Sequence, residues 1–168
     1  MRVFPFLLLV LAVLIATELS FRVYAYGPGA LNPWRMNSYN QIHHSGLVQP
    51  AAIPDIGYEL KPGVDDWYKG TRFKTNSFGM RDDEYTPEKP AKTFRIAVLG
   101  SSWTMGAGVP VEAIWHSQLE EMLNQRNDGW RYELLNFGVE QYGFGEITAT
   151  LENKVPAFAP DLILLSVT

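Results

Sequence analysis

Three short apolar runs, separated by two stretches of helical character, constrain the fold of this chain more than any other feature. The runs cover residues 94–100, 131–138 and 160–167, and each is rich in Ile, Leu, Val or Phe. Such runs fit strands that are buried on both faces of a sheet. Because the elements alternate with short loops, we expect right-handed parallel crossovers. The order predicts an α/β fold, namely the N-terminal half of a doubly wound, flavodoxin-like parallel sheet in three layers.

The two intervening stretches carry apolar side chains at the spacing of an amphipathic helix. In residues 111–126 and 144–155 these side chains are Trp115, Leu119, Met122 and Leu123, followed by Ile147, Leu151 and Val155. The third strand is expected to end at about residue 168. In such sheets, ligands bind outside the carboxyl ends of the strands. We therefore expect the domain to continue beyond residue 168, with its site at that edge.

The first residues of the chain form an apolar segment. Residues 3–24 are predominantly apolar, and their only charged side chains are Glu18 and Arg22, which stand one helical turn apart and could pair. About 20 apolar residues cross a bilayer as a helix, so the segment predicts a signal anchor with the domain outside the cytoplasm. Trp34 would lie near its outer end. Two alternatives stay open, cleavage after Ala25 to give a secreted domain, and a buried amphipathic helix.

Residues 26–93 have poor hydrophobic periodicity and abundant turn residues. The stretches "YGPGALNPW", "KPGVDDW" and "TPEKPAK" all contain Pro or Gly at the positions of turns. We interpret this part as an irregular linker and arm laid over the domain, with one short extended piece in residues 72–85. The predicted organisation is thus an anchor at 1–25, an arm at 26–93 and the α/β domain at 94–168.

Composition and charge exclude several classes of function. Hydrophobic residues make up 46% of the chain and charged residues 19%, which is typical of a globular protein. The formal net charge of -4 gives no basic surface for nucleic acid. The chain has no cysteine, which excludes disulfides, thiolate metal sites and a cysteine nucleophile. No metal-ligand spacing is present, and no cofactor is expected.

The loop after the first predicted strand is the strongest candidate for a site. It reads "GSSWTMGAGV" from Gly100 to Val109, and its small residues allow the backbone to approach a ligand closely. Backbone N–H groups near a helix start could hold an anion or a developing oxyanion. The loop could equally be a turn that only connects a strand to a helix, or a flavin-phosphate loop of the flavodoxin kind.

Three better-known motifs fail on spacing in this loop. A P-loop requires four residues between its glycines and then a lysine, whereas five residues separate Gly100 from Gly106 and no lysine follows. The third glycine of a dinucleotide fingerprint is absent after Gly108. A nucleophile elbow requires a glycine at the position of Thr104.

The strand and loop together resemble block I of the SGNH (GDSL-like) hydrolases, a family of serine esterases. That block usually reads Gly-Asp-Ser followed by an apolar residue, which places Ser102 on the nucleophile. The stretch "LLNFGVEQYGFG" is similar to block II, and "PDLILLSV" leads toward block III. The stretch "TNSFGMR" resembles the lead-in of membrane-anchored members. The resemblance covers residues 76–168.

The resemblance implies a mechanism and a set of site residues. Ser102 would attack an ester carbonyl, and the backbone N–H groups of Ser102 and Gln141 would bind the oxyanion. The residues that would support these loops are Gly100, Gly106, Gly108, Asn136, Gly138 and Gly143. An oxyanion Asn from block III and an Asp-x-x-His pair from block V are expected after residue 168. Together with the predicted topology, the resemblance implies an ester substrate, for which an acylated glycan or lipid is the expected class. Residues 3–24 would contact the membrane lipid bilayer.

Two positions depart from the family pattern. Ser101 replaces the Asp of block I, and Gln141 stands where block II has a glycine, whose backbone angles a side chain tolerates poorly. The histidines do not supply a base: His116 is expected to be packed or partly exposed in the first helix, and His43 and His44 to be solvated. The sequence therefore predicts a membrane-anchored serine ester hydrolase. The alternatives are an inactive tethered binding or structural module and a flavodoxin-like phosphate or flavin binder.

Overall fold

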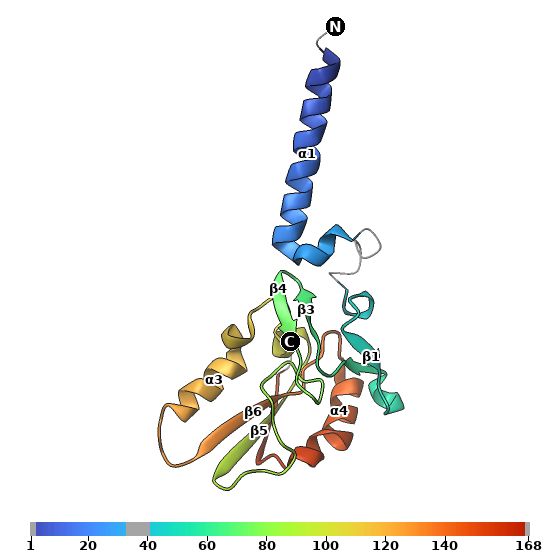
Figure 1. The fold of residues 1–168 in the computed structure, drawn as a ribbon. Helices are drawn as coiled ribbons and strands as arrows, with labels where there is room; N and C mark the ends of the chain where they lie inside the picture. The colour runs from blue at the N-terminus through green and yellow to red at the C-terminus, as the bar shows by residue number, and fades with distance from the viewer. Residues whose placement is uncertain (1–2, 33–40, 167–168) are drawn as a thin grey trace.

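The computed structural model describes residues 3–32 and 41–166. It consists of one long N-terminal helix, α1 (Val3–Tyr26), and a domain that lies at the C-terminal end of this helix (Figure 1). Trp34, which the sequence analysis placed near the outer end of the anchor, lies outside the described residues.

The domain is built on a parallel sheet of three strands in the order β6-β5-β7. These strands are β5 (Thr93–Leu99), β6 (Arg131–Asn136) and β7 (Leu162–Leu165). The two registers pair Ile96 with both Leu134 and Leu162. All three predicted strands and their parallel direction are confirmed.

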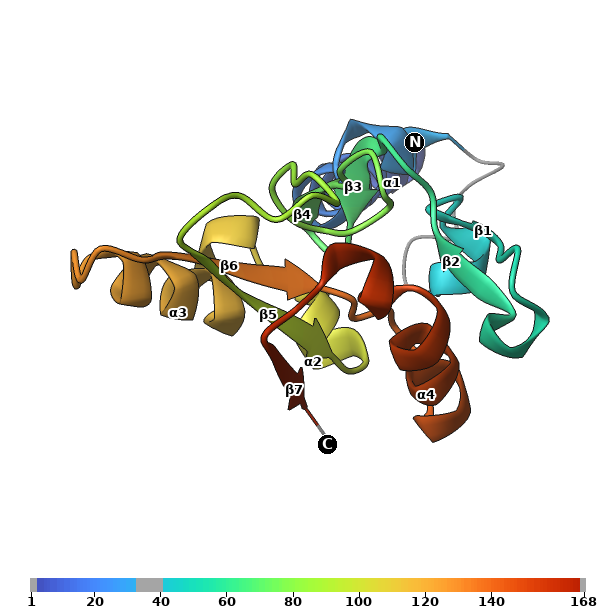
Figure 2. The same ribbon diagram turned by 90° about the horizontal axis from the view of Figure 1, so that it is seen from below.

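Helices cover the two faces of the sheet. Side chains alternate along β5, so that Ile96 and Val98 pack on one face with α3 (Trp115–Asn124). Ala97 and Leu99 pack on the other face, in the cluster that includes Ile147 of α4 (Phe144–Asn153). Figure 2 shows α3 and α4 as the two connections between the strands. Helical crossovers thus cover β5 and β6 on both faces. The third strand was also expected to be buried on both faces, but Leu162, Ile163 and Leu165 of β7 are 41–47% exposed within the described residues.

The connections leave β5 in the centre. The chain passes from β5 through α3 to β6 on one side, and then through α4 to β7 on the other side of β5. The direction of strand addition therefore reverses around the carboxyl end of β5. In open parallel sheets this reversal opens a crevice between the flanking loops, and ligands bind there.

The helices differ slightly from the sequence prediction. The first predicted helix is divided, because a 3-10 turn, η5 (Val111–Ala113), precedes α3. Met122 was expected on the buried stripe but is 65% exposed, while Trp115, Leu119 and Leu123 do pack on the sheet. The stripe of the second helix is confirmed, and the chain leaves it through the 3-10 turn η6 (Val155–Phe158).

The arm contains more regular structure than its turn residues indicate. It forms two antiparallel hairpins, β1 (Val48–Pro50) with β2 (Tyr58–Leu60), and β3 (Asp65–Tyr68) with β4 (Thr71–Lys74). Short 3-10 turns lie around them: η1 (Pro28–Leu31), η3 (Ile42–His44) and η4 (Pro54–Ile56). The strand β4 accounts for the expected extended piece.

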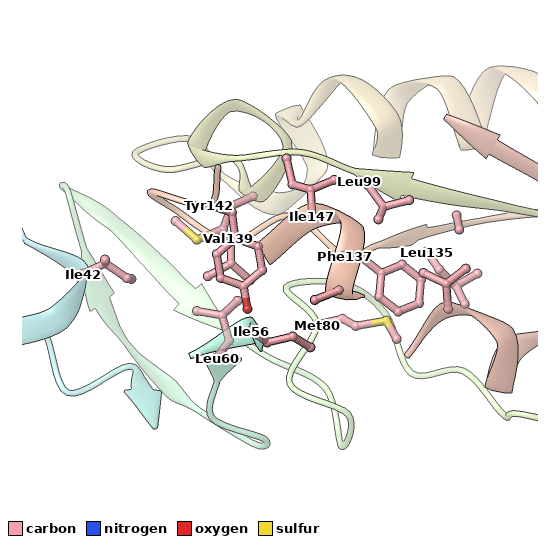
Figure 3. Packing of buried hydrophobic residues seen from close by; sticks show 14 of the residues in the cluster. Ile42, Ile56, Leu60, Met80, Leu99, Leu135, Phe137, Val139, Tyr142 and Ile147 are labelled. Atoms are coloured by element: carbon pink, nitrogen blue, oxygen red, sulfur yellow. The ribbon is translucent and has the colours of Figure 1, made fainter. Parts of the chain in front are cut away.

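Side chains of the arm belong to the main hydrophobic core. Ile42, Ile56, Leu60 and Met80 are buried in one cluster with residues of the sheet such as Leu135 (Figure 3). The arm therefore completes the layer that α4 begins, and it folds as part of the domain.

The helix α1 stands away from the domain. Its apolar part, Phe4–Ala25, is long and apolar enough to span a membrane or to serve as a signal sequence. Its described side chains are mostly exposed, which contradicts the alternative of a buried amphipathic helix. The expected pair of Glu18 and Arg22 is present, with 2.7 Å between Oε1 and Nε.

Candidate functional site

Ser102 lies at the carboxyl end of the central strand. It opens a single helical turn, α2 (Ser102–Met105), immediately after β5. The first N–H groups of a helix have no partner inside it, and within residues 3–32 and 41–166 the N–H of Ser102 has no acceptor. Ser102 forms one wall of a surface hollow of about 330 Å³, together with Lys69, Trp103, Gly106, Ala107 and Val109.

Two glycines shape the loop after α2. Gly106 ends the helix with a left-handed φ of 78°, and a Cβ atom there would collide with the side chain of Ile114. Gly108 also has a positive φ of 76°, and its Cα faces the carbonyl oxygen of Lys69. Both positions accept only glycine without strain.

Arg81 fixes this loop through hydrogen bonds to its backbone carbonyl oxygens. Its buried guanidinium donates to the carbonyl oxygens of Met105 at 3.2 Å and Val109 at 2.5 Å, and also to that of Gly106. The cation lies over the ring of Phe73, 4.8 Å from its centroid. Burial lowers the pKa of Arg81 to about 10, so the side chain remains charged at neutral pH. Sequence analysis missed this role, although "TNSFGMR" was part of the resemblance.

His116 supports the same turn and does not act as a base. Its side chain is fully buried, and Nε2 lies 3.2 Å from the carbonyl oxygen of Thr104. Burial lowers the pKa of His116 to about 4, so the imidazole is neutral at pH 7 and donates through Nε2. His43 and His44 are exposed in η3, as expected.

Asn136 organises the second loop, which follows β6. Its Oδ1 accepts from the N–H of Gly138 at 2.9 Å, and its Nδ2 donates to the carbonyl oxygen of Arg81 at 3.1 Å. The N–H of Asn136 donates to the carboxyl of Asp82 at 2.8 Å. Asp82 begins the run Asp82-Asp83-Glu84, which as a cluster of charges predicts a solvated surface. The structure instead desolvates Asp82, and this burial raises its pKa to about 8. Arg81 and Asp82 together brace both loops.

The two loops are in close contact. A Cβ atom on Gly138 would lie 2.6 Å from the backbone nitrogen of Met105, so the second loop packs directly on α2. The N–H of Val139 donates to the carbonyl oxygen of Gly100 at 3.3 Å. A Cβ atom on Gly100 would collide with the side chain of Thr104. Gly100 and Gly138 thus permit the close approach of the loops.

Gln141 has a left-handed backbone, with a φ of 68°. Its neighbours use their N–H groups, Glu140 toward Sδ of Met105 at 3.4 Å and Tyr142 toward the carbonyl oxygen of Val139 at 3.2 Å. Among the residues that the structure describes, the N–H of Gln141 has no acceptor. The loop ends at Gly143, whose N–H donates to the Glu146 carboxylate at 2.9 Å and so caps the start of α4.

Glu140 is a buried carboxylate that sequence analysis did not single out. It accepts from the Lys69 ammonium at 2.7 Å and from the Tyr68 hydroxyl at 3.0 Å. Both donors come from the hairpin of β3 and β4, so an ion pair fixes the arm to the second loop. Only the long-range fold could reveal this pair, because 71 residues separate its members.

The candidate site comprises a serine hydroxyl and backbone N–H groups that can donate. Within residues 3–32 and 41–166, no histidine is hydrogen-bonded to the Ser102 hydroxyl, and no group of three His, Cys, Asp or Glu side chains could hold a metal ion. Ser102 is partly exposed beside the hollow, and the loop that carries Gln141 contacts α2 through Gly138. Gln141 itself is not among the residues that line the hollow.

Comparisons with known proteins give no relative for this chain. No model of a protein family matches it, and no match was found among the curated proteins or among the solved structures.

Proposed function

We propose that the chain carries the nucleophile half of an SGNH-like serine ester hydrolase, with Ser102 as the nucleophile. The observation that carries this proposal is the backbone of Gln141. At the position where the resemblance expects a glycine, a glutamine holds a left-handed φ of 68° and its N–H has no acceptor among the described residues. A left-handed backbone costs a non-glycine residue about 1 kcal/mol. Such strain persists where the surrounding structure imposes it, as it also does at Lys92, Asn127 and Ala159; at Gln141 it coincides with the position that the resemblance assigns to the oxyanion hole.

The arrangement of the sheet supports the proposal independently of the resemblance. Ser102 follows the central strand at the point where strand addition reverses, the location at which open α/β sheets bind ligands. The order β6-β5-β7 is also that of the first strands of a flavodoxin-like sheet, the fold that we propose for the domain.

In the proposed reaction, Ser102 Oγ attacks the ester carbonyl and the alcohol leaves with a proton. The N–H groups of Ser102 and Gln141 stabilise the oxyanion of the tetrahedral intermediate. Water then hydrolyses the acyl-enzyme and releases the acid. Removing the serine proton requires a base, which the resemblance assigns to a histidine in a block after residue 168.

We further propose that α1 is an uncleaved anchor. The end of the helix is part of the folded domain, because Gly27 is buried and its Cα faces the ring of Trp67. Cleavage after Ala25 would cut the chain inside this packed junction. The domain would then remain on the outer surface of the membrane.

The test is covalent labelling of the protein in its native membranes by a fluorophosphonate probe, which phosphonylates activated serines. We expect labelling of the wild type and of Ser101→Ala, and none of Ser102→Ala. Ser101 is a matched control because its side chain makes no capping hydrogen bond to α2. Absence of labelling in the folded wild type would favour the alternative, an inactive tethered module.

A further inference from the structure

We propose that the hollow beside Ser102 opens at the bilayer surface and that its substrate is an acyl ester carried by a membrane lipid. This inference rests on the proposed function and on α1 as an anchor. It is carried by the turn at Lys69 and Gly70, between β3 and β4, which contacts both the end of α1 and the nucleophile loop.

The first contact joins the turn to the end of the apolar helix. A Cβ atom on Gly70 would lie 2.9 Å from the carbonyl oxygen of Ala25, the last residue of the apolar span. On the same hairpin, the ring of Trp67 lies against Gly27. Figure 1 shows β3 and β4 as the part of the domain beneath the base of α1. The hairpin is therefore at the level where the helix leaves the membrane.

The second contact joins the same turn to the nucleophile loop. A Cβ atom on Gly108 would lie 3.4 Å from the carbonyl oxygen of Lys69, and the Lys69 side chain lines the hollow that contains Ser102. The ammonium of Lys69 also pairs with the buried Glu140, next to Gln141. One two-residue turn thus separates the end of the membrane span from the hollow.

The exposed side chains around this junction suit a membrane interface. Aromatic and apolar residues gather there: Tyr24 is 84% exposed, Leu31 50%, Trp67 38% and Trp103 72%. Trp and Tyr favour the boundary between headgroups and hydrocarbon. Trp103 stands next to Ser102, so the surface that contacts the lipid would continue to the rim of the hollow.

The lining of the hollow favours a lipid over a charged polymer. Apart from Ser102 and Lys69 it consists of Trp103, Gly106, Ala107 and Val109. The positive charge of Lys69 is already paired with the Glu140 carboxylate, with 2.7 Å between Nζ and Oε1. An apolar acyl chain would bury surface against the indole and the valine, with its carbonyl at the serine.

The absence of cysteine allows a direct test of position. Trp103→Cys and Trp130→Cys each carry one bimane label, in full-length protein reconstituted into phosphatidylcholine vesicles. Trp130 is a matched control, because it is also an exposed tryptophan, 53% exposed, but it precedes β6 at the opposite edge of the sheet. The quencher is phosphatidylcholine with a nitroxide on its headgroup or near the top of its acyl chain.

We expect the label at position 103 to lose most of its fluorescence and the label at position 130 to lose none. Wild-type protein in the same vesicles should hydrolyse a long-chain phospholipid ester faster than a soluble short-chain ester. If the two bimane labels are quenched equally, or if the label at position 103 is not quenched, the inference of a lipid-facing hollow is wrong. The proposed function still stands in that case, provided that the fluorophosphonate probe reacts with Ser102 of the wild type. Loss of Ser102 labelling overturns the proposed function, and the lipid substrate with it.

Discussion

Gln141 combines a glycine-like backbone with a long side chain. Replacing it by glycine removes the strain of the left-handed conformation, so we expect Gln141→Gly to raise the free energy of unfolding by about 1 kcal/mol. Chemical denaturation measures this difference. Gln141→Ala is the control, because alanine keeps the strain and should leave stability nearly unchanged. An equal gain in both variants would mean that the side chain, and not the backbone, is unfavourable.

His116 makes the stability of the domain depend on pH. Its pKa is lowered from 6.5 to about 4, so between these values the unfolded chain binds a proton that the folded protein does not. The contribution of the neutral imidazole is present above pH 6.5 and declines by about 1.4 kcal/mol per pH unit toward pH 4.

We expect the free energy of unfolding of the wild type, relative to that of His116→Gln, to fall by about 1.4 kcal/mol per pH unit as the pH is lowered from 6.5 toward 4. Denaturation series from pH 7 to 4 would measure it. The comparison uses the difference between variant and wild type because Asp82 also makes stability depend on pH. The pKa of Asp82 is raised, so its contribution to the free energy of unfolding is lost as pH rises toward about 8, which is a slope opposite in sign to that of His116. A flat difference for His116→Gln would contradict the buried, neutral imidazole.

At the scale of elements, the contact of the second loop with α2 sets the position of Ser102. A methyl group on Gly138 would lie 2.6 Å from the nitrogen of Met105, so we expect Gly138→Ala to destabilise the domain by about 1–3 kcal/mol. It should also slow fluorophosphonate labelling, because α2 must move. Gly145→Ala in α4 is the matched control.

A Cβ atom on Gly145 meets no atom within 4 Å, so alanine there should be neutral or stabilising and should leave labelling unchanged. Equal behaviour of the two variants would show that the loops do not constrain each other.

The sequence predicted those elements whose side chains form a continuous apolar run or follow a helical period. The strands β5, β6 and β7 were found from their apolar runs, and the helices α3 and α4 from apolar residues three to four apart, with small errors at their ends. The hairpins of the arm were missed because strands of three or four residues are too short to show a period. The hydrogen bonds of Arg81 to the loop after α2, and those of Glu140 to the hairpin of β3 and β4, join residues at least 24 positions apart, which no local pattern contains.

At the scale of the whole molecule, the junction between α1 and the domain predicts that the anchor is retained. We expect the protein extracted from native membranes to contain residues 1–25, and to stay in the membrane after washing with alkaline carbonate. Intact mass and peptide mapping of the N-terminus are the measurements. A mature N-terminus at Tyr26, with the protein in the soluble fraction, would contradict the anchor.

The free side of β7 is where the sheet can be extended. Within the described part of the chain, β7 pairs with β5 along one edge only, and Leu162, Ile163 and Leu165 are 47%, 41% and 47% exposed. An open edge with apolar side chains on it accepts another strand. A strand that pairs there would extend the parallel sheet and cover these three side chains.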